Sequence, residues 1–207
     1  MSQERPSLVT VGSTVAAAER IVAWLQPVLQ GNNPDQVPVV ERHIGQFNTP
    51  EEVKRHLSDK CGCIRIAALR VRDIKHQAGG VVGTVTWCAY VMATDYWGYG
   101  RDLRAEVMVS KLAKRIANPQ AAKEMGAERK ADTLSADNIY SGSLDNLGLT
   151  MWAVMWSQEF KLDEETDISE LPDFLRMGMT ATPRGGVPVI ESVINVREQE
   201  DDENQTS

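Results

Sequence analysis

The three histidines are the first residues to consider for chemistry, because imidazole binds metals and transfers protons near neutral pH. His43, His56 and His76 fall in three different expected elements, and none has a second histidine or cysteine three or four residues away. The HExxH and CxxC spacings that are typical of zinc sites are also missing from the sequence. The sequence therefore predicts no metal site and no bound cofactor.

The cysteines are the second candidates, since a thiolate is a strong nucleophile. Cys61 and Cys63 fall on one side of an extended chain, but a reactive thiolate needs an oriented histidine or a nearby positive charge to lower its pKa. We interpret both as small buried residues at the start of a strand. A small cytoplasmic cysteine-dependent enzyme is the alternative, and a reaction of Cys61 or Cys63 with a thiol probe that is much faster than that of Cys88 would favour it.

Glycines and carboxylates complete the search for catalytic groups. The stretch WGYGRDLR lacks the third glycine of a dinucleotide-binding loop and the lysine of a P-loop, so we expect Gly98 and Gly100 only to turn the chain into a helix. The remaining candidates are carboxylates in polar loops without a matched acid and base, at Asp132, Asp137 and Asp145. We therefore expect no catalytic residues and a protein that is not an enzyme.

A group of aromatic residues beside arginines is the most unusual local feature. Tyr96, Trp97 and Tyr99 lie in a glycine-rich loop that is followed by Arg101 and Arg104. Tyrosine, tryptophan and arginine are enriched at protein interfaces. The loop is a candidate contact surface, although the same rings could instead fold back onto the edge of a sheet.

Length and composition are those of a globular protein. The 207 residues fit one domain, and 42% hydrophobic with 25% charged residues is an ordinary balance. Of the formal charge of -7, the segment REQEDDENQTS carries -4. No basic stripe suited to DNA binding, no signal peptide and no apolar run that could span a membrane is evident. We divide the chain into a polar leader (1–12), one domain (13–196) and a disordered acidic tail (197–207), made in a reducing cytoplasm.

Apolar residues at steps of three and four predict two main helices. The first begins after Ser13 or Thr14, either of which can cap it, and Pro27 is expected to kink or end it near Gln26. The second lies within RDLRAEVMVSKLAKRIANP and ends at the final Asn-Pro pair. Its predicted buried stripe consists of Ala105, Met108, Val109, Leu112, Ala113 and Ile116. A shorter helix follows Thr49, the first residue of a TPEE capping sequence.

Alternating apolar residues predict the strands. We expect a short strand within residues 39–46, a hairpin of strands at 63–71 and 83–94, a tryptophan-rich strand at 150–162 and a last strand at 187–196. In the tryptophan-rich strand the even positions from Trp152 to Leu162 share one buried face. The odd positions are apolar at the start of the strand and polar at its C-terminal end, so we expect one side of the C-terminal end to face water. Residues 120–137 are left undecided between helix and mobile loop, and 163–186 are typical of a linker.

This order of elements predicts an α/β protein of the α+β type. We expect a single domain with a mainly antiparallel or mixed central sheet and two main helices packed on one face. Because two helices cannot cover both faces of a twisted sheet, part of the sheet is expected to face solvent or another subunit.

The arrangement resembles the tail terminator proteins of Mu-like phages and prophages. The resemblance covers roughly residues 14–163: an amphipathic helix, the hairpin CIRIAALRV and VVGTVTWCAYVMAT, the helix LRAEVMVSKLAKRIAN, and SADNIYSGSLDNLGLTMWAVMWSQEFKLD. The last segment carries it most specifically, because IYSGSLDNLGL leads into a strand with Trp152, Trp156 and Gln158. The resemblance adds no catalytic residues.

The resemblance implies a subunit of a homo-oligomeric ring, expected to be a hexamer, at the head-proximal end of a phage tail tube. Such a ring ends tube polymerisation, contacts the tail tube protein and joins the head-tail connector protein. DNA passes through it without specific binding, which an acidic chain permits. The implied location is the virion tail or neck, reached from the host cytoplasm during assembly.

Two regions are the predicted ring contacts. One is the aromatic loop with Tyr96, Trp97, Tyr99 and Arg101, and the other is the hairpin connector at residues 73–80, including Lys75 and His76. A different head-to-tail connector or neck protein is the alternative within the virion, and a gene position just before the tail tube genes would favour a terminator over it.

Overall fold

The computed structural model describes residues 6–57, 61–77, 80–163, 176–181 and 190–195. The chain divides into one compact unit from Met1 to Glu165 and a second from Thr166 to Ser207, and each is described by itself. The predicted acidic tail at 197–207 lies outside the described residues.

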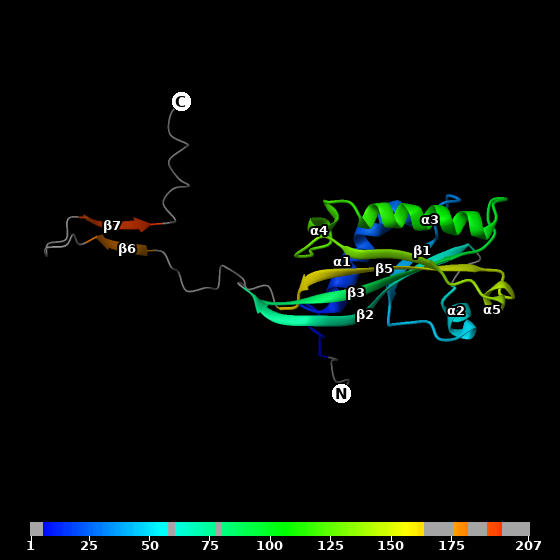
Figure 1. Ribbon diagram of the computed structural model, residues 1–207, viewed down its shortest axis with the longest axis horizontal. Helices are drawn as coiled ribbons and strands as arrows, with labels where there is room; N and C mark the ends of the chain where they lie inside the picture. The colour runs from blue at the N-terminus through cyan, green and yellow to red at the C-terminus, as the bar shows by residue number, and fades with distance from the viewer. Residues whose placement is uncertain (1–5, 58–60, 78–79, 164–175, 182–189, 196–207) are drawn as a thin grey trace, which may run out of the picture. The chain divides into compact units, whose positions relative to one another are not determined.

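A mixed five-stranded sheet is the centre of the first unit (Figure 1). Its strand order is β1-β2-β3-β5-β4. The strands are β1 (Val39–His43), β2 (Gly62–Gln77), β3 (Gly80–Ala93), β4 (Asp132–Asn138) and β5 (Thr150–Lys161). Only β1 and β2 run parallel, and the other neighbours are antiparallel. This sheet with helices packed on it confirms the predicted α+β class.

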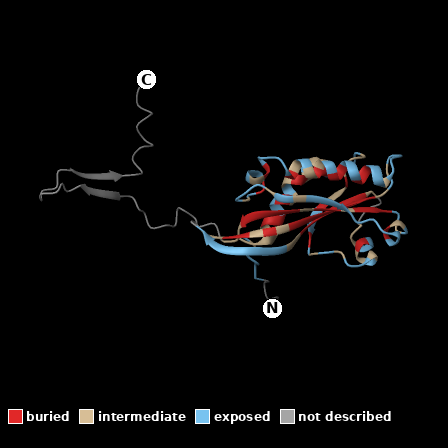
Figure 2. Ribbon diagram, in the orientation of Figure 1, coloured by how far each residue is buried: buried red, intermediate tan, exposed pale blue. Residues whose placement is uncertain are grey.

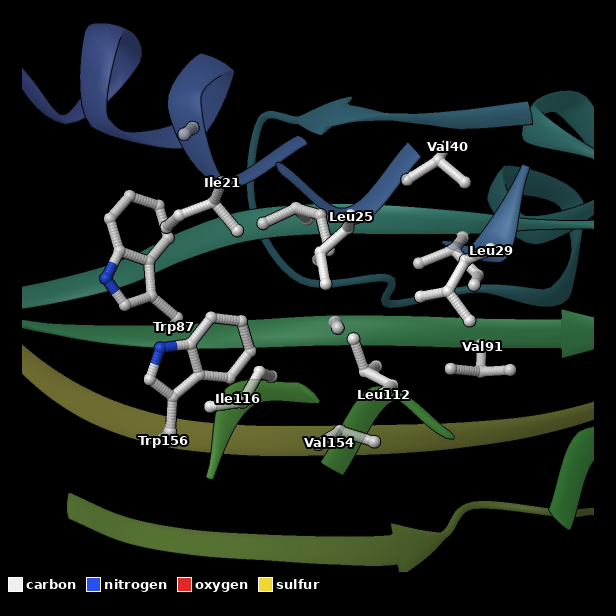
Figure 3. Close-up of a cluster of buried hydrophobic side chains, with 14 of the residues drawn as sticks. Ile21, Leu25, Leu29, Val40, Trp87, Val91, Leu112, Ile116, Val154 and Trp156 are labelled. Atoms are coloured by element: carbon white, nitrogen blue, oxygen red, sulfur yellow. The ribbon is translucent and has the colours of Figure 1, made fainter. Parts of the chain in front are cut away.

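Two long helices, α1 (Thr14–Leu29) and α3 (Arg101–Ile116), pack on one face of the sheet as predicted. Their apolar residues meet the inward side chains of the central strands, among them Val91, Val154 and the stacked pair Trp87 and Trp156 (Figure 3). The ring centroids of that tryptophan pair are 6.4 Å apart. This cluster is the main core and fixes both helices against the sheet.

The prediction that Pro27 ends or kinks the first helix near Gln26 is wrong about the end, because α1 continues to Leu29. Ser13 caps the helix by accepting hydrogen bonds from the backbone of its first turn. Leu25 and Leu29 are completely buried, and their packing outweighs the backbone hydrogen bond that proline cannot donate. The buried side chains of Leu25 and Leu29, on either side of Pro27, therefore keep the helix continuous through the proline.

The second face of the sheet is also covered at one end, by two short helices, α2 (Pro50–His56) and α5 (Gly142–Asp145). Val53 of α2 and Leu144 of α5 belong to a second apolar cluster with Cys88, Tyr90 and other residues of this face. Thr49 caps α2 as predicted, and Glu52 completes the turn by accepting a 2.8 Å hydrogen bond from the backbone N–H of Asn48.

Three sequence expectations differ from the structure. Residues 73–77 of the hairpin connector belong to β2 and not to a loop, and β3 begins at Gly80. The undecided segment contains the short helix α4 (Ala121–Glu124) and the edge strand β4. The polar end of β5 does not face water, because Ser157 and Glu159 are 7% and 9% exposed, with Lys75 and Arg129 in ion pairs to Glu159.

The second unit contains an antiparallel pair, β6 (Arg176–Ala181) and β7 (Ile190–Asn195). The last predicted strand is therefore present in its described part, and it pairs with β6, which lies in the segment interpreted as a linker. Across the described residues, none of the helices has the length and hydropathy needed to cross a lipid bilayer.

Candidate assembly surface

The aromatic loop forms a tight turn at the end of β3, here called the aromatic turn (Tyr96–Tyr99). The backbone N–H of Tyr96 donates to the carbonyl of Tyr99 at 3.1 Å, and the N–H of Tyr99 donates back at 3.0 Å. Trp97 and Gly98 between them have φ values of 54° and 78°. Positive φ at both central residues is what a type I′ turn requires, and it is unfavourable for a bulky residue such as tryptophan.

The Trp97 side chain is exposed but held in place. Its exposed fraction is 66%, and its indole Nε1 donates a 3.0 Å hydrogen bond to the carbonyl of Asn32 in the loop after α1. The Tyr96 ring packs edge-on against it, with ring centroids 5.6 Å apart. A strained backbone that presents an ordered, exposed indole is typical of a recognition site rather than of a core.

Arg104, in the first turn of α3, fixes the position of the aromatic turn. Its side chain is 2% exposed, and its guanidinium lies 5.1 Å from the centre of the Tyr96 ring. It donates hydrogen bonds to the carbonyl oxygens of Pro34, Gln36, Cys61 and Thr94. One buried cation thereby joins the loop after α1, the start of β2 and the end of β3, and the strong hydrogen bonds of a charged donor compensate for its burial.

Arg101 stabilises the same region from within the subunit. Its backbone N–H donates to the Asp95 carboxylate at 2.8 Å, and its guanidinium forms an ion pair with Asp145 of α5. The Arg101 side chain is therefore engaged inside its own chain, although it was predicted as a contact residue together with the tyrosines and Trp97.

An apolar groove adjoins the aromatic turn. Tyr99, Leu103, Val107 and Pro34 line a depression of about 210 Å³, and Leu103 and Val107 are 53% and 40% exposed. At its rim the ammonium of Lys111 pairs with Asp35 and holds the pKa of that carboxyl below its usual value. The apolar surface thus extends from the aromatic turn along the outer side of α3.

Leu103 and Val107 were missed from the sequence, since they lie outside the predicted buried stripe of α3. The signal that could have found them is their spacing of four residues, which places them on one side of a helix directly after the aromatic turn. The loop after α1 also contributes to this surface, since Asn32 accepts the Trp97 hydrogen bond and Pro34 lines the groove. No sequence signal predicts this contribution, because it depends on tertiary packing.

The second predicted contact region lies at the opposite end of β3. Lys75 and His76 are opposite Val82 and Val81 in the β2-β3 ladder, while the aromatic turn follows Ala93. At about 3.3 Å per residue, the two regions are separated by roughly 40 Å along the strand (Figure 1). Lys75 pairs with Glu159 at 3.3 Å and keeps half of its side chain exposed. The structure brings the aromatic residues together, and it does not bring Lys75 and His76 to them.

The cysteine and histidine positions give little support for covalent chemistry. Cys63 is buried, which raises the pKa of its thiol, and its sulfur lies 3.5 Å from the backbone carbonyl of His56. His43 and His56 form an aromatic cluster with Phe47, with 4.7 Å between the two imidazole centroids. Within the described parts of the chain, no three metal-binding side chains come together.

The comparisons with known proteins assign no family. No model of a protein family matches the sequence, and no curated protein matches it at a significant level.

Proposed function

We propose that this protein is a phage tail terminator: a subunit of a ring that caps the head-proximal end of a tail tube and joins it to the head connector. The proposal is supported by the resemblance of residues 14–163 to that family and by the α+β unit expected from it. The expected assembly is a hexamer, located in the tail or neck of the virion, with DNA passing through the ring without specific binding.

One observation carries the proposal: an exposed tryptophan is held rigidly at one end of the sheet. Trp97 keeps 66% of its surface exposed while its indole is hydrogen-bonded to Asn32 and packed on Tyr96. Ordering an exposed aromatic side chain before binding removes an entropic cost from association. Tyr99, Leu103 and Val107 enlarge the same apolar surface, which suits a permanent subunit contact better than a transient polar one.

A ring requires that each subunit has two different contact surfaces, since heterologous contacts can close into a cycle. The aromatic turn supplies one candidate surface at one end of the sheet. The β2-β3 hairpin end, with Lys75 and His76, supplies another at the opposite end. Two unlike surfaces on one subunit meet this requirement, whichever surface of the next copy each of them contacts.

The test measures capping directly. Tail tube protein from the same phage or prophage is polymerised with and without this protein, and tube lengths and tube ends are recorded by negative-stain electron microscopy. Added protein is expected to shorten the tubes and to appear as a ring at one end, with a solution mass near six subunits by light scattering. Unchanged tube lengths with bare ends would contradict the proposal.

The same samples distinguish the alternative neck protein. Rings that leave tube lengths unchanged but bind the head connector complex would assign the chain to a head-to-tail connector instead of a terminator. The aromatic turn would then still be an assembly surface, and only the neighbouring virion protein that the ring contacts would differ.

A further inference from the structure

The central sheet has two edges that no described strand covers. β1 pairs with β2 only as far as Ala67, so the outer side of β2 from Arg70 to Gln77 has no described neighbour. The residues of this stretch are all exposed (Figure 2). At the other side of the sheet, β4 pairs with β5 alone, and all its residues except Leu134 are exposed. An uncovered strand edge presents unpaired backbone donors and acceptors to any chain that approaches.

The two edges carry opposite charge. The β2 edge has Arg70, Arg72 and Lys75 against a single Asp73, with Arg72 paired to Asp73 and Lys75 to Glu159, so that the net charge of the strand edge is positive. The β4 edge has Asp132 and Asp137 and no basic residue. Like charges placed opposite each other are unfavourable across strands and opposite charges are favourable, so β2 is repelled by a second β2 and attracted by β4.

The topology gives this pairing a direction. β4 runs opposite to β5, and β5 runs opposite to β3, as does β2. β2 and β4 of one subunit are therefore antiparallel, and a second copy in the same orientation would place its β4 antiparallel to the β2 edge. Antiparallel ladders are the more stable kind, and short ones suffice when the charges select the partner.

We propose that the basic β2 edge of one subunit pairs with the acidic β4 edge of the next, so that the sheets of neighbouring copies join around the ring. The pairing is heterologous because the two edges lie on opposite sides of one sheet, and repeated heterologous pairing closes into a ring when the rotation between neighbouring copies closes. This inference rests on the proposed self-assembly, and it names the partner of the hairpin end: a second copy of this chain, through its β4.

The register predicts a stagger between subunits. β4 pairs with β5 residues 152–157. Across the sheet, these residues are in register with β2 residues 64–70, whereas the uncovered part of β2 continues from there to Gln77 at the hairpin. Joining the two edges therefore requires neighbouring sheets to shift along the strand direction, as strands in closed sheets do. Each edge also contains a register irregularity, near Asp73 and near Thr133, which limits the regular ladder to a few residues.

The test exchanges the charges of the two edges in the full chain. One variant carries Arg70→Glu and Arg72→Glu, a second carries Asp132→Lys and Asp137→Lys, and a third carries all four changes. Light scattering over a range of concentrations should show wild-type rings and at least about tenfold weaker association of the first two variants, since each sets like charges against each other. The fourfold variant, and an equal mixture of the first two, should recover assembly.

A control variant with Lys54→Glu and Lys114→Glu changes two exposed charges on α2 and α3, neither of them on an edge strand, and should assemble as the wild type does. Thermal unfolding of each variant separates failed assembly from failed folding. Unaltered assembly of the two edge variants, or no recovery in a folded fourfold variant, would overturn the pairing, as would a wild type that stays monomeric. Wild-type rings that assemble by these edges but leave tube growth unchanged would overturn the terminator function and keep the pairing.

Discussion

The indole Nε1 of Trp97 lies 3.0 Å from the carbonyl oxygen of Asn32, so a side chain that is 66% exposed is hydrogen-bonded to a loop 65 residues earlier in the chain. The backbone of Trp97 has a φ of 54°, where asparagine and glycine are far more common. The turn therefore keeps a tryptophan where the backbone alone would favour another residue. We propose recognition of a partner as the reason for this choice, because a ring that stays mostly exposed contributes little burial to folding.

Replacement of Trp97 by asparagine tests that reason. Asn-Gly is the preferred sequence for a type I′ turn, so Trp97→Asn should improve the turn while it removes the indole. We expect the free energy of unfolding to stay within about 1 kcal/mol of the wild-type value, since the better turn offsets the lost hydrogen bond. We expect self-association to weaken at least about tenfold, as for an interface residue worth more than about 1.4 kcal/mol. Urea denaturation and light scattering measure the two quantities.

Leu8→Asn is the matched control, because Leu8 is 84% exposed and lies in the segment before α1, outside the aromatic turn and both edge strands. It should leave both quantities unchanged. A Trp97→Asn protein that unfolds easily would show that the indole belongs to the core, and one that assembles normally would remove the aromatic turn from the interface.

Most of the fold could be predicted from the sequence, because its main elements have strong local signals. The spacing of Ala105, Met108 and Leu112 predicted α3, and Ser13 marked the start of α1. β4 has only a weak signal, since Leu134 and Ala136 are the only apolar residues of DTLSADN, and only Leu134 packs against the core. The segment becomes a strand mainly through its backbone pairing with β5. An alternation this short is not enough to predict a strand.

The candidate site was predictable only in part. The types of Trp97 and Tyr99 beside glycines indicated a contact surface, and both side chains are exposed. Their supports were not predictable, because Asn32 and Arg104 meet them through tertiary structure. Arg104 was predicted only as an arginine of the candidate contact surface, yet it is almost completely buried among four carbonyl groups of three chain segments.

Arg104→Met should destabilise the protein strongly while it preserves much of the side-chain volume. It leaves carbonyl oxygens of Pro34, Gln36 and Cys61 without their donor, and each unsatisfied buried group costs about 1 to 3 kcal/mol. We expect a loss of about 3 kcal/mol or more in the free energy of unfolding, measured by urea denaturation.

Lys114→Met on the same helix is the control for Arg104→Met, because its side chain is exposed and it should change the stability by less than about 0.5 kcal/mol. Equal stabilities of the two variants would mean that Arg104 does not hold the three segments together. A destabilised Arg104→Met protein that still folds at low temperature should also lose the fixed position of Tyr96, and with it part of its self-association.

The cysteines decide between a structural protein and the cysteine-dependent alternative. Burial raises the pKa of Cys88 to about 12 and that of Cys63 above its ordinary value, and only the thiolate reacts. Cys61 is the least buried of the three, so we expect a thiol probe at pH 8 to label it in the native protein well before the other two. Faster labelling of Cys61 than of Cys88 then reflects access to solvent and does not favour the enzyme, contrary to the criterion taken from the sequence. Cys63 and Cys88 should react only at the rate at which the chain unfolds, and a Cys61→Ser variant should lose the fast phase. A fast phase that survives in Cys61→Ser would reveal an activated thiol at Cys63 or Cys88, and catalysis would then have to be considered before assembly.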